Sequence, residues 1–196
     1  MNNTNKIILD LCGGTGAWSK PYADAGYKVI NVTLPAYNVL HYIDIMPDDV
    51  YGILAAPPCT MFSLARTRAK KPRDFNEGME IVIACLKIIW KARSRQKLAF
   101  WALENPMGYL RQFLGKPPLT FDPCDFGDPY TKKTDLWGYY NMPTKKPIVL
   151  DEETKARLKI NNRKLPSISD FTGSKQAARR AITPPGFAKA FFMSNN

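Results

Sequence analysis

A short apolar run that ends at two consecutive prolines constrains the fold of this 196-residue chain more than any other feature. Residues 51–56 have the composition of a buried strand, and Pro57 and Pro58 end it because neither has a backbone N–H to donate. Cys59 therefore follows the carboxyl end of a strand, where open α/β sheets place their ligands. A free cysteine is also commonly a small buried hydrophobe, so this segment alone leaves a reactive and a structural thiol as equal interpretations.

Further apolar runs alternate with segments of helical character along the rest of the chain. Buried strands are expected at residues 6–11, 27–32 and 98–103, followed by a hairpin-like pair at 119–124 and 135–140. Helices are expected over 17–25, from a cap at Asn76 to about residue 97 with Cys85 in its apolar face, over 151–164, and over 188–193. This alternation predicts an α/β fold with a mostly parallel sheet.

A length of 196 residues predicts a single domain over residues 1–196. The apolar fraction of 45% is typical of a folded globular chain. No apolar run reaches the roughly 20 residues that a membrane helix needs, and the polar first five residues do not resemble a signal peptide. The four cysteines lie far apart and there is one histidine, which argues against a zinc site and for reduced thiols in the cytoplasm.

The net charge of +11 favours a polyanionic partner such as nucleic acid, without separating DNA from RNA. Residues 63–73 concentrate five cations and contain no acid. We interpret this segment as a basic loop that contacts phosphates, the alternative being an ordinary solvated run of charges.

Two other segments place chemically useful groups after predicted strands. Residues 12–16 form a glycine-rich turn inside a β-α-β unit, but the spacing of the glycines matches neither a dinucleotide fingerprint nor a P-loop, so ligand binding and simple packing both stay open. Glu104 follows the run 98–103 and precedes Asn105-Pro106. A carboxylate at the tip of a buried strand is costly unless another group uses it, which suggests an assembled site.

Five segments, in this order along the chain, resemble the motifs of the cytosine-5 DNA methyltransferases: residues 10–16, 44–45, 57–63, 104–106 and 130–137. The chain is similar to compact, phage-like members of that family. The resemblance implies a Rossmann-like methyltransferase fold, S-adenosylmethionine as cofactor, and double-stranded DNA as partner with the target cytosine flipped out of the helix.

The resemblance also implies roles for individual residues. Cys59 would attack carbon 6 of cytosine. Glu104, in its protonated form, would hydrogen-bond the cytosine ring, and Lys133 would supply a cation at the same site. The positions that would hold the cofactor are Asp10, Leu11, Cys12, Gly13, Gly14, Gly16, Trp18, Thr33, Asp44, Ile45 and Pro58. The positions that would contact nucleic acid are Ser63, Arg66, Arg68, Lys70, Lys71, Arg73 and Lys132.

Several features depart from the family pattern. Thr33 stands where an acid usually binds the ribose, and Cys12 stands where many members have a phenylalanine. Residues 144–183 form only a short charged insertion in place of a target-recognition domain, which predicts relaxed sequence specificity or a protein partner for targeting.

Three functions are consistent with these observations. The first is a DNA cytosine-5 methyltransferase acting in the cytoplasm of a bacterium or a phage-infected host. The second modifies cytosine in RNA or in a free nucleotide, or uses a variant sulfonium cofactor. The third is an inactive DNA-binding protein on a methyltransferase scaffold, which has no use for the pair Cys59 and Glu104.

Overall fold

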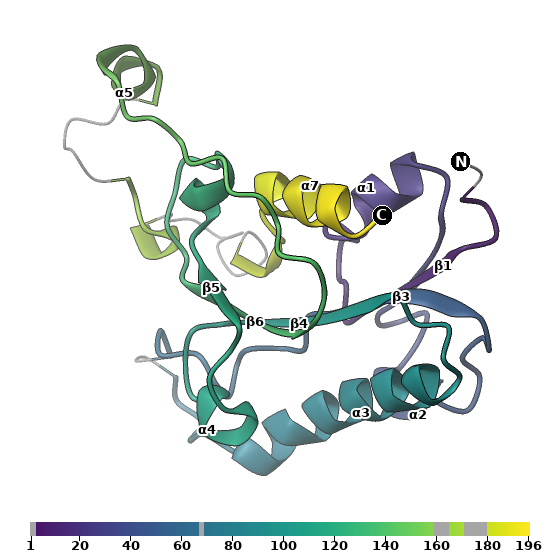
Figure 1. Cartoon of the computed structure of the whole chain (residues 1–196). Coiled ribbons are helices and arrows are strands. Elements are labelled where there is room, and N and C mark those ends of the chain that lie inside the picture. Colours follow the sequence, from purple (N-terminus) through teal and green to yellow (C-terminus); the bar gives the residue numbers. More distant parts are fainter. Residues whose placement is uncertain (1–2, 67–68, 159–164, 171–179) are drawn as a thin grey trace.

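The computed structural model describes residues 3–66, 69–158, 165–170 and 180–196, and within them six strands form one sheet in the order β2-β1-β3-β4-β6-β5 (Figure 1). The strands are β1 (Ile7–Leu11), β2 (Lys28–Val32), β3 (Val50–Ala55), β4 (Phe100–Pro106), β5 (Leu119–Phe121) and β6 (Thr134–Tyr139). The first four strands are parallel, and β6 is antiparallel to both β4 and β5. This arrangement confirms the predicted α/β class with a mostly parallel sheet.

Helices cover both faces of the sheet (Figure 1). On one face lie α1 (Lys20–Asp24) and α7 (Pro185–Ser194), and on the other lie α2 (Val39–Tyr42) and α3 (Phe75–Ser94). Helix α4 (Arg111–Leu114) lies near the start of α3, whereas α5 (Glu152–Leu158) projects away from the sheet. Two single 3₁₀ turns, η1 (Pro123–Phe126) and η2 (Ile168–Asp170), complete the described elements.

Each face of the sheet has its own core. Under α3 the core is mainly aliphatic, and Cys85 is fully buried in it, as the sequence predicted. Under α1 and α7 the core is aromatic: the rings of Trp18 and Phe191 lie 5.6 Å apart, and those of Tyr22 and Phe100 also lie 5.6 Å apart. The aromatic core fixes the carboxyl-terminal helix against the glycine-rich half of the chain.

Several predicted boundaries were wrong, each because a tertiary or local contact intervenes. Helix α1 begins only at Lys20, since the preceding residues form turns. Helix α3 is capped by Asp74 rather than Asn76, because the Asp74 carboxylate accepts hydrogen bonds from two backbone N–H groups of the first turn. The predicted strand 119–124 ends at Phe121, where Pro123 starts a 3₁₀ turn.

Strand β4 extends three residues further than predicted. Residues 104–106 pair antiparallel with Leu136, Asp135 and Thr134 of β6 after the pairing with β3 has ended at Leu103. Glu104 therefore lies inside the strand and its backbone is held in register. Among the described residues, no helix is both long and apolar enough to cross a bilayer.

Candidate active site at the carboxyl ends of β3 and β4

The candidate site lies where the order of the strands reverses. Strand β1 has β2 on one side and β3 on the other, so β1 and β3 flank the switch point at which open α/β sheets bind ligands. The glycine-rich turn follows β1, and Cys59 follows β3. The sheet thus brings the glycine-rich turn and the Cys59 turn to the same side, at the carboxyl ends of the parallel strands.

Cys59 sits on a turn that is fixed from both sides. The buried Asn105 side chain donates a hydrogen bond from Nδ2 to the carbonyl oxygen of Pro57 at 2.9 Å. After the cysteine, the backbone N–H groups of Phe62 and Ser63 both donate to the Cys59 carbonyl oxygen, at 3.0 and 2.8 Å. The half-buried thiol is therefore carried by a rigid backbone.

Glu104 is a buried carboxyl group that lacks full hydrogen bonding. Its side chain is 8% exposed, and Oε2 has no hydrogen-bond partner among the described residues. Burial raises the pKa of Glu104, and the nearby Lys132 ammonium opposes that rise in part. A carboxyl group in such surroundings favours its protonated form and can donate a hydrogen bond.

Cys59, Glu104 and Lys132 act on one another electrostatically. Burial raises the pKa of the Cys59 thiol first, the Glu104 carboxylate raises it further, and the Lys132 cation lowers it. The structure thus brings the two predicted catalytic residues together and adds a cation from the segment before β6. The sequence placed Lys133 in this role and Lys132 on nucleic acid, but Lys133 is exposed, and the Lys132 Nζ donates to the Arg180 carbonyl oxygen at 2.9 Å.

The glycine-rich turn requires glycine for a steric reason at its first position. A Cβ added to Gly13 would lie 2.3 Å from the Cγ of Asp10, so no side chain fits there. The Asp10 carboxylate supports the turn from below: Oδ2 accepts a hydrogen bond from the Ser19 hydroxyl at 2.6 Å, and Oδ1 has no partner among the described residues. Burial raises the pKa of Asp10 to about 6, although the hydrogen bonds from Ser19 lower it.

Asn31 is a residue of this site that the sequence analysis missed. It lies on β2 and donates from Nδ2 to the Gly14 carbonyl oxygen at 3.0 Å. Its Oδ1 is buried and, within the described part of the chain, has no hydrogen-bond partner. Period-two alternation along β2 could have indicated it, since Asn31 and the buried Val32 point to opposite faces of the sheet. Thr33, which the resemblance suggested instead, is half-buried beyond the end of the strand.

The other predicted cofactor positions divide into exposed and buried groups. Asp44, Pro58 and Ile45 are exposed, Ile45 to 66%, so their side chains are accessible to a ligand. Leu11 is fully buried in the core, and Trp18, only 1% exposed, packs on the aromatic rings of α7. A direct contact between the Trp18 side chain and a ligand is therefore ruled out in this conformation, and its role is to support packing.

Cys12 adopts a left-handed backbone conformation, with φ of 57°, that non-glycine residues rarely take. Its half-buried side chain packs against the core under α3. A hydrogen bond from Cys85 lowers the pKa of Cys12. This thiol is thus directed toward α3 and supports the turn, in which Gly14 and Gly16 also have positive φ angles.

The basic segment is more firmly attached than the sequence suggested. The Arg73 guanidinium donates to the carbonyl oxygens of Met61 and Ser63, at 2.9 and 2.8 Å, and lies 4.8 Å from the centroid of the Tyr109 ring. Arg73 is therefore a structural clamp rather than a phosphate contact. Lys71 pairs with Glu77 at 2.6 Å on the surface. Ser63 and Arg66 are half-buried and Lys70 is exposed, whereas Arg68 lies outside the described residues.

This chain aligns with known proteins over part of their length. No protein-family model matches this chain. The Type II methyltransferase M.AplI of Arthrospira platensis is 29% identical over an alignment of 128 residues that covers 56% of this chain and 35% of that protein, so the chain spans about a third of its relative. Among solved structures, a triple mutant of Spodoptera frugiperda DNMT2 aligns over 87% of this chain and 60% of its own, with 14% identity and a TM-score of 0.41.

Proposed function

We propose that this chain transfers a methyl group from S-adenosylmethionine to carbon 5 of cytosine in DNA, through a covalent bond between Cys59 and carbon 6. The observation that carries the proposal is that a strand-end thiol, a buried carboxyl group and a cation lie close enough to influence one another electrostatically. The similarity to a Type II methyltransferase supports methyl transfer as the reaction class. The net charge of +11 supports a nucleic-acid substrate.

Carbon 5 of cytosine is a weak nucleophile, so the ring must first be activated. The Cys59 thiol releases its proton to water, and the sulfur forms a bond to carbon 6 while the electron pair of the carbon 5–carbon 6 double bond moves onto the ring. Lys132 favours the thiolate that this step needs, and Glu104 no longer opposes it once that carboxyl group is protonated.

Glu104 donates a proton that neutralises the charge developing on the ring. As the sulfur–carbon bond forms, the electron pair moves to the ring nitrogen, where the Glu104 proton neutralises it. Carbon 5 then has enamine character and accepts the methyl group. Loss of the carbon 5 proton to a base and cleavage of the sulfur–carbon bond return the electrons to Cys59 and the proton to Glu104.

The residues around the glycine-rich turn fit S-adenosylmethionine. The turn offers exposed backbone at Gly14, and the buried Asn31 Oδ1 needs a hydrogen-bond donor, which a ribose hydroxyl provides. Exposed Asp44 and Ile45 give a polar and an apolar contact for the adenine. When bound, S-adenosylmethionine supplies the methyl group.

We propose that residues 1–196 act as one catalytic domain in the cytoplasm of a bacterial or phage-infected cell, and that 144–183 replace a recognition domain. The target sequence would then be selected only weakly, or with the help of a protein partner.

A mechanism-based trap tests this function. Oligonucleotides with 5-fluorocytosine should form an adduct that survives denaturing electrophoresis, because the fluorine at carbon 5 cannot leave as a cation after methyl transfer. The adduct should disappear in Cys59→Ser, persist in the control Cys124→Ser, and form slowly in Glu104→Gln. DNA, RNA and 5-fluorocytidine triphosphate are compared as substrates, and absence of an adduct with all three contradicts the covalent mechanism.

A further inference from the structure

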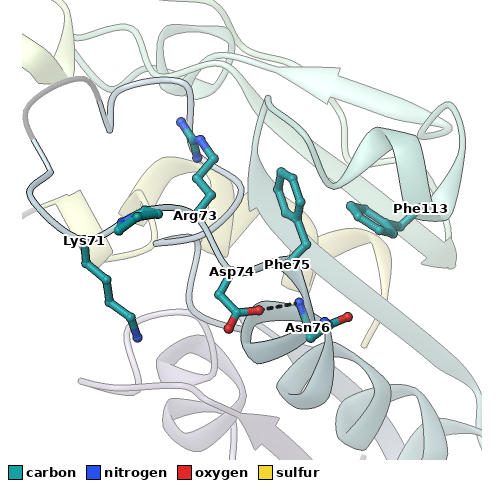
Figure 2. Close-up of a pocket in the computed structure, with 7 residues that line it drawn as sticks. Lys71, Arg73, Asp74, Phe75, Asn76 and Phe113 are labelled. Carbon is teal, nitrogen blue, oxygen red and sulfur yellow. Dashed lines mark hydrogen bonds between the residues drawn. The ribbon is translucent and has the colours of Figure 1, made fainter.

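A surface pocket of about 580 Å³ lies at the base of the basic segment, beside the first turn of α3 (Figure 2). Its walls come from the end of the basic segment, from α3 and from α4. Two aromatic residues form its apolar part: Phe75, the first residue of α3, and Phe113 of α4. Their ring centroids lie 5.4 Å apart, and Phe113 remains 45% exposed.

This pocket is joined to the candidate active site by one buried ring. Phe62 is fully buried, and its ring lies 6.2 Å from Phe75 and 6.1 Å from Phe113. The backbone N–H of Phe62 donates to the Cys59 carbonyl oxygen at 3.0 Å. Phe62 therefore contacts the aromatic wall of the pocket with its side chain and the turn that carries Cys59 with its backbone.

Two polar side chains of the pocket are hydrogen-bonded within the protein. Arg73 is bonded to two carbonyl oxygens, and the Asp74 carboxylate accepts from the backbone of α3 (Figure 2). Lys71 lines the same pocket and pairs with Glu77 at 2.6 Å, while Lys70 on the basic segment and Lys116 just after α4 are exposed. An exposed aromatic face beside several cations is the combination that binds unstacked bases and their phosphates.

We propose that this pocket binds an unpaired nucleobase next to the target cytosine, so that the preferred substrate is a single-stranded stretch of nucleic acid. The proposal rests on the proposed function, since it places the second base beside Cys59. A base inside a duplex is stacked and paired and cannot enter a concave pocket, whereas a single strand offers free base faces. The volume suits one nucleotide, and the short 144–183 segment offers few elements for reading a duplex groove.

Fluorescence anisotropy with a labelled single strand of random sequence, and with the same strand in a duplex, tests the pocket. Phe113→Ala should weaken single-strand binding by about fivefold or more, as for loss of one stacked base, and leave duplex binding within about twofold. Phe113→Trp should restore the single-strand affinity. The matched control is Tyr139→Ala, which removes a ring that is 64% exposed on β6, opposite Trp101 near the start of β4.

Thermal unfolding of each variant identifies any loss caused by misfolding, since Phe113 also contacts Phe62 and Phe75. Unchanged single-strand affinity in folded Phe113→Ala, or an equal loss for duplex or in Tyr139→Ala, would overturn the proposal. These measurements use no methyl donor and can be repeated in Cys59→Ser. If no fluorocytosine adduct forms but single-strand binding still depends on Phe113, the covalent mechanism is contradicted and the pocket is not. If the adduct forms but single-strand binding does not depend on Phe113, the pocket is contradicted and the covalent mechanism is not.

Discussion

The amide of Asn105 joins the end of β4 to the turn at the end of β3, because its Nδ2 donates to the Pro57 carbonyl oxygen at 2.9 Å. Asn105 is adjacent to Glu104, and Pro57 lies two residues before Cys59. One buried hydrogen bond therefore sets the position of the carboxyl group relative to the thiol.

Replacing Asn105 with Ala should impair the site more than the fold. The Pro57 carbonyl loses its donor and a small cavity forms, so the free energy of unfolding should fall by roughly 1–3 kcal/mol. Formation of the fluorocytosine adduct should slow much more than this loss of stability explains. Urea unfolding and the adduct assay measure the two effects, and an unaltered adduct rate would show that the bond is not needed for positioning.

The titration of Cys59 should depend on Lys132 and Glu104 but not on Lys133. Lys132→Met should raise the pKa of the thiol because a favourable cation is lost, and Glu104→Gln should lower it because a repelling carboxylate is lost. Lys133→Met is the matched control and should leave it unchanged. The rate of iodoacetamide alkylation of the Cys59 peptide against pH, followed by mass spectrometry, reports each midpoint. An equal shift in Lys133→Met would return that residue to the site.

The stability of the protein should fall as the pH rises from about 4 to about 6. Burial raises the pKa of Asp10 from 3.8 to about 6, so in this window the folded chain keeps a proton that the unfolded chain has released. The change amounts to roughly 3 kcal/mol in the free energy of unfolding and is complete above the folded pKa. Asp10→Asn should remove the part of this slope that Asp10 contributes and leave the part from the buried Glu104, whereas the exposed Asp44→Asn should retain the full slope. Urea denaturation at several pH values gives the comparison.

Asn31 should contribute to binding of S-adenosylmethionine, and Thr33 should not. Removing the buried Oδ1 acceptor in Asn31→Ala should weaken binding by about two- to tenfold, the effect of one neutral hydrogen bond. Thr33→Ala should bind as the unmodified protein does. Calorimetric titration with S-adenosylmethionine measures both, and the reverse order would place the ribose contact at Thr33, in which case Thr33→Glu should tighten binding.

The cations of the basic segment should separate into two kinds. Replacing Arg66 and Arg68 with Met should lower the slope of log affinity for DNA against log salt by about two units, because two phosphate contacts are lost. Arg73→Met should leave the slope unchanged and lower the free energy of unfolding by roughly 1–3 kcal/mol, since two carbonyl oxygens lose their donor. A stable Arg73→Met with a reduced slope would restore Arg73 as a phosphate contact.

Local sequence determined the strands and the position of the thiol. The apolar runs at 6–11, 27–32 and 51–56 each became a strand within one residue of the prediction, because a buried strand needs only a short apolar run and a residue that stops it. Pro57 and Pro58 supplied that stop directly. The parallel pairing of β3 with β4 then brought the ends of the two strands, and with them Cys59 and Glu104, to the same side of the sheet.

Tertiary structure decided which of several similar side chains reaches the site. Lys132 rather than Lys133 lowers the pKa of Cys59, and its ammonium donates to the Arg180 carbonyl 48 residues away in the chain. Trp18 packs into the core only because α7 returns from the other end of the sequence to cover it. Contacts between distant segments depend on how the whole chain packs, so a local pattern of residue types does not predict them.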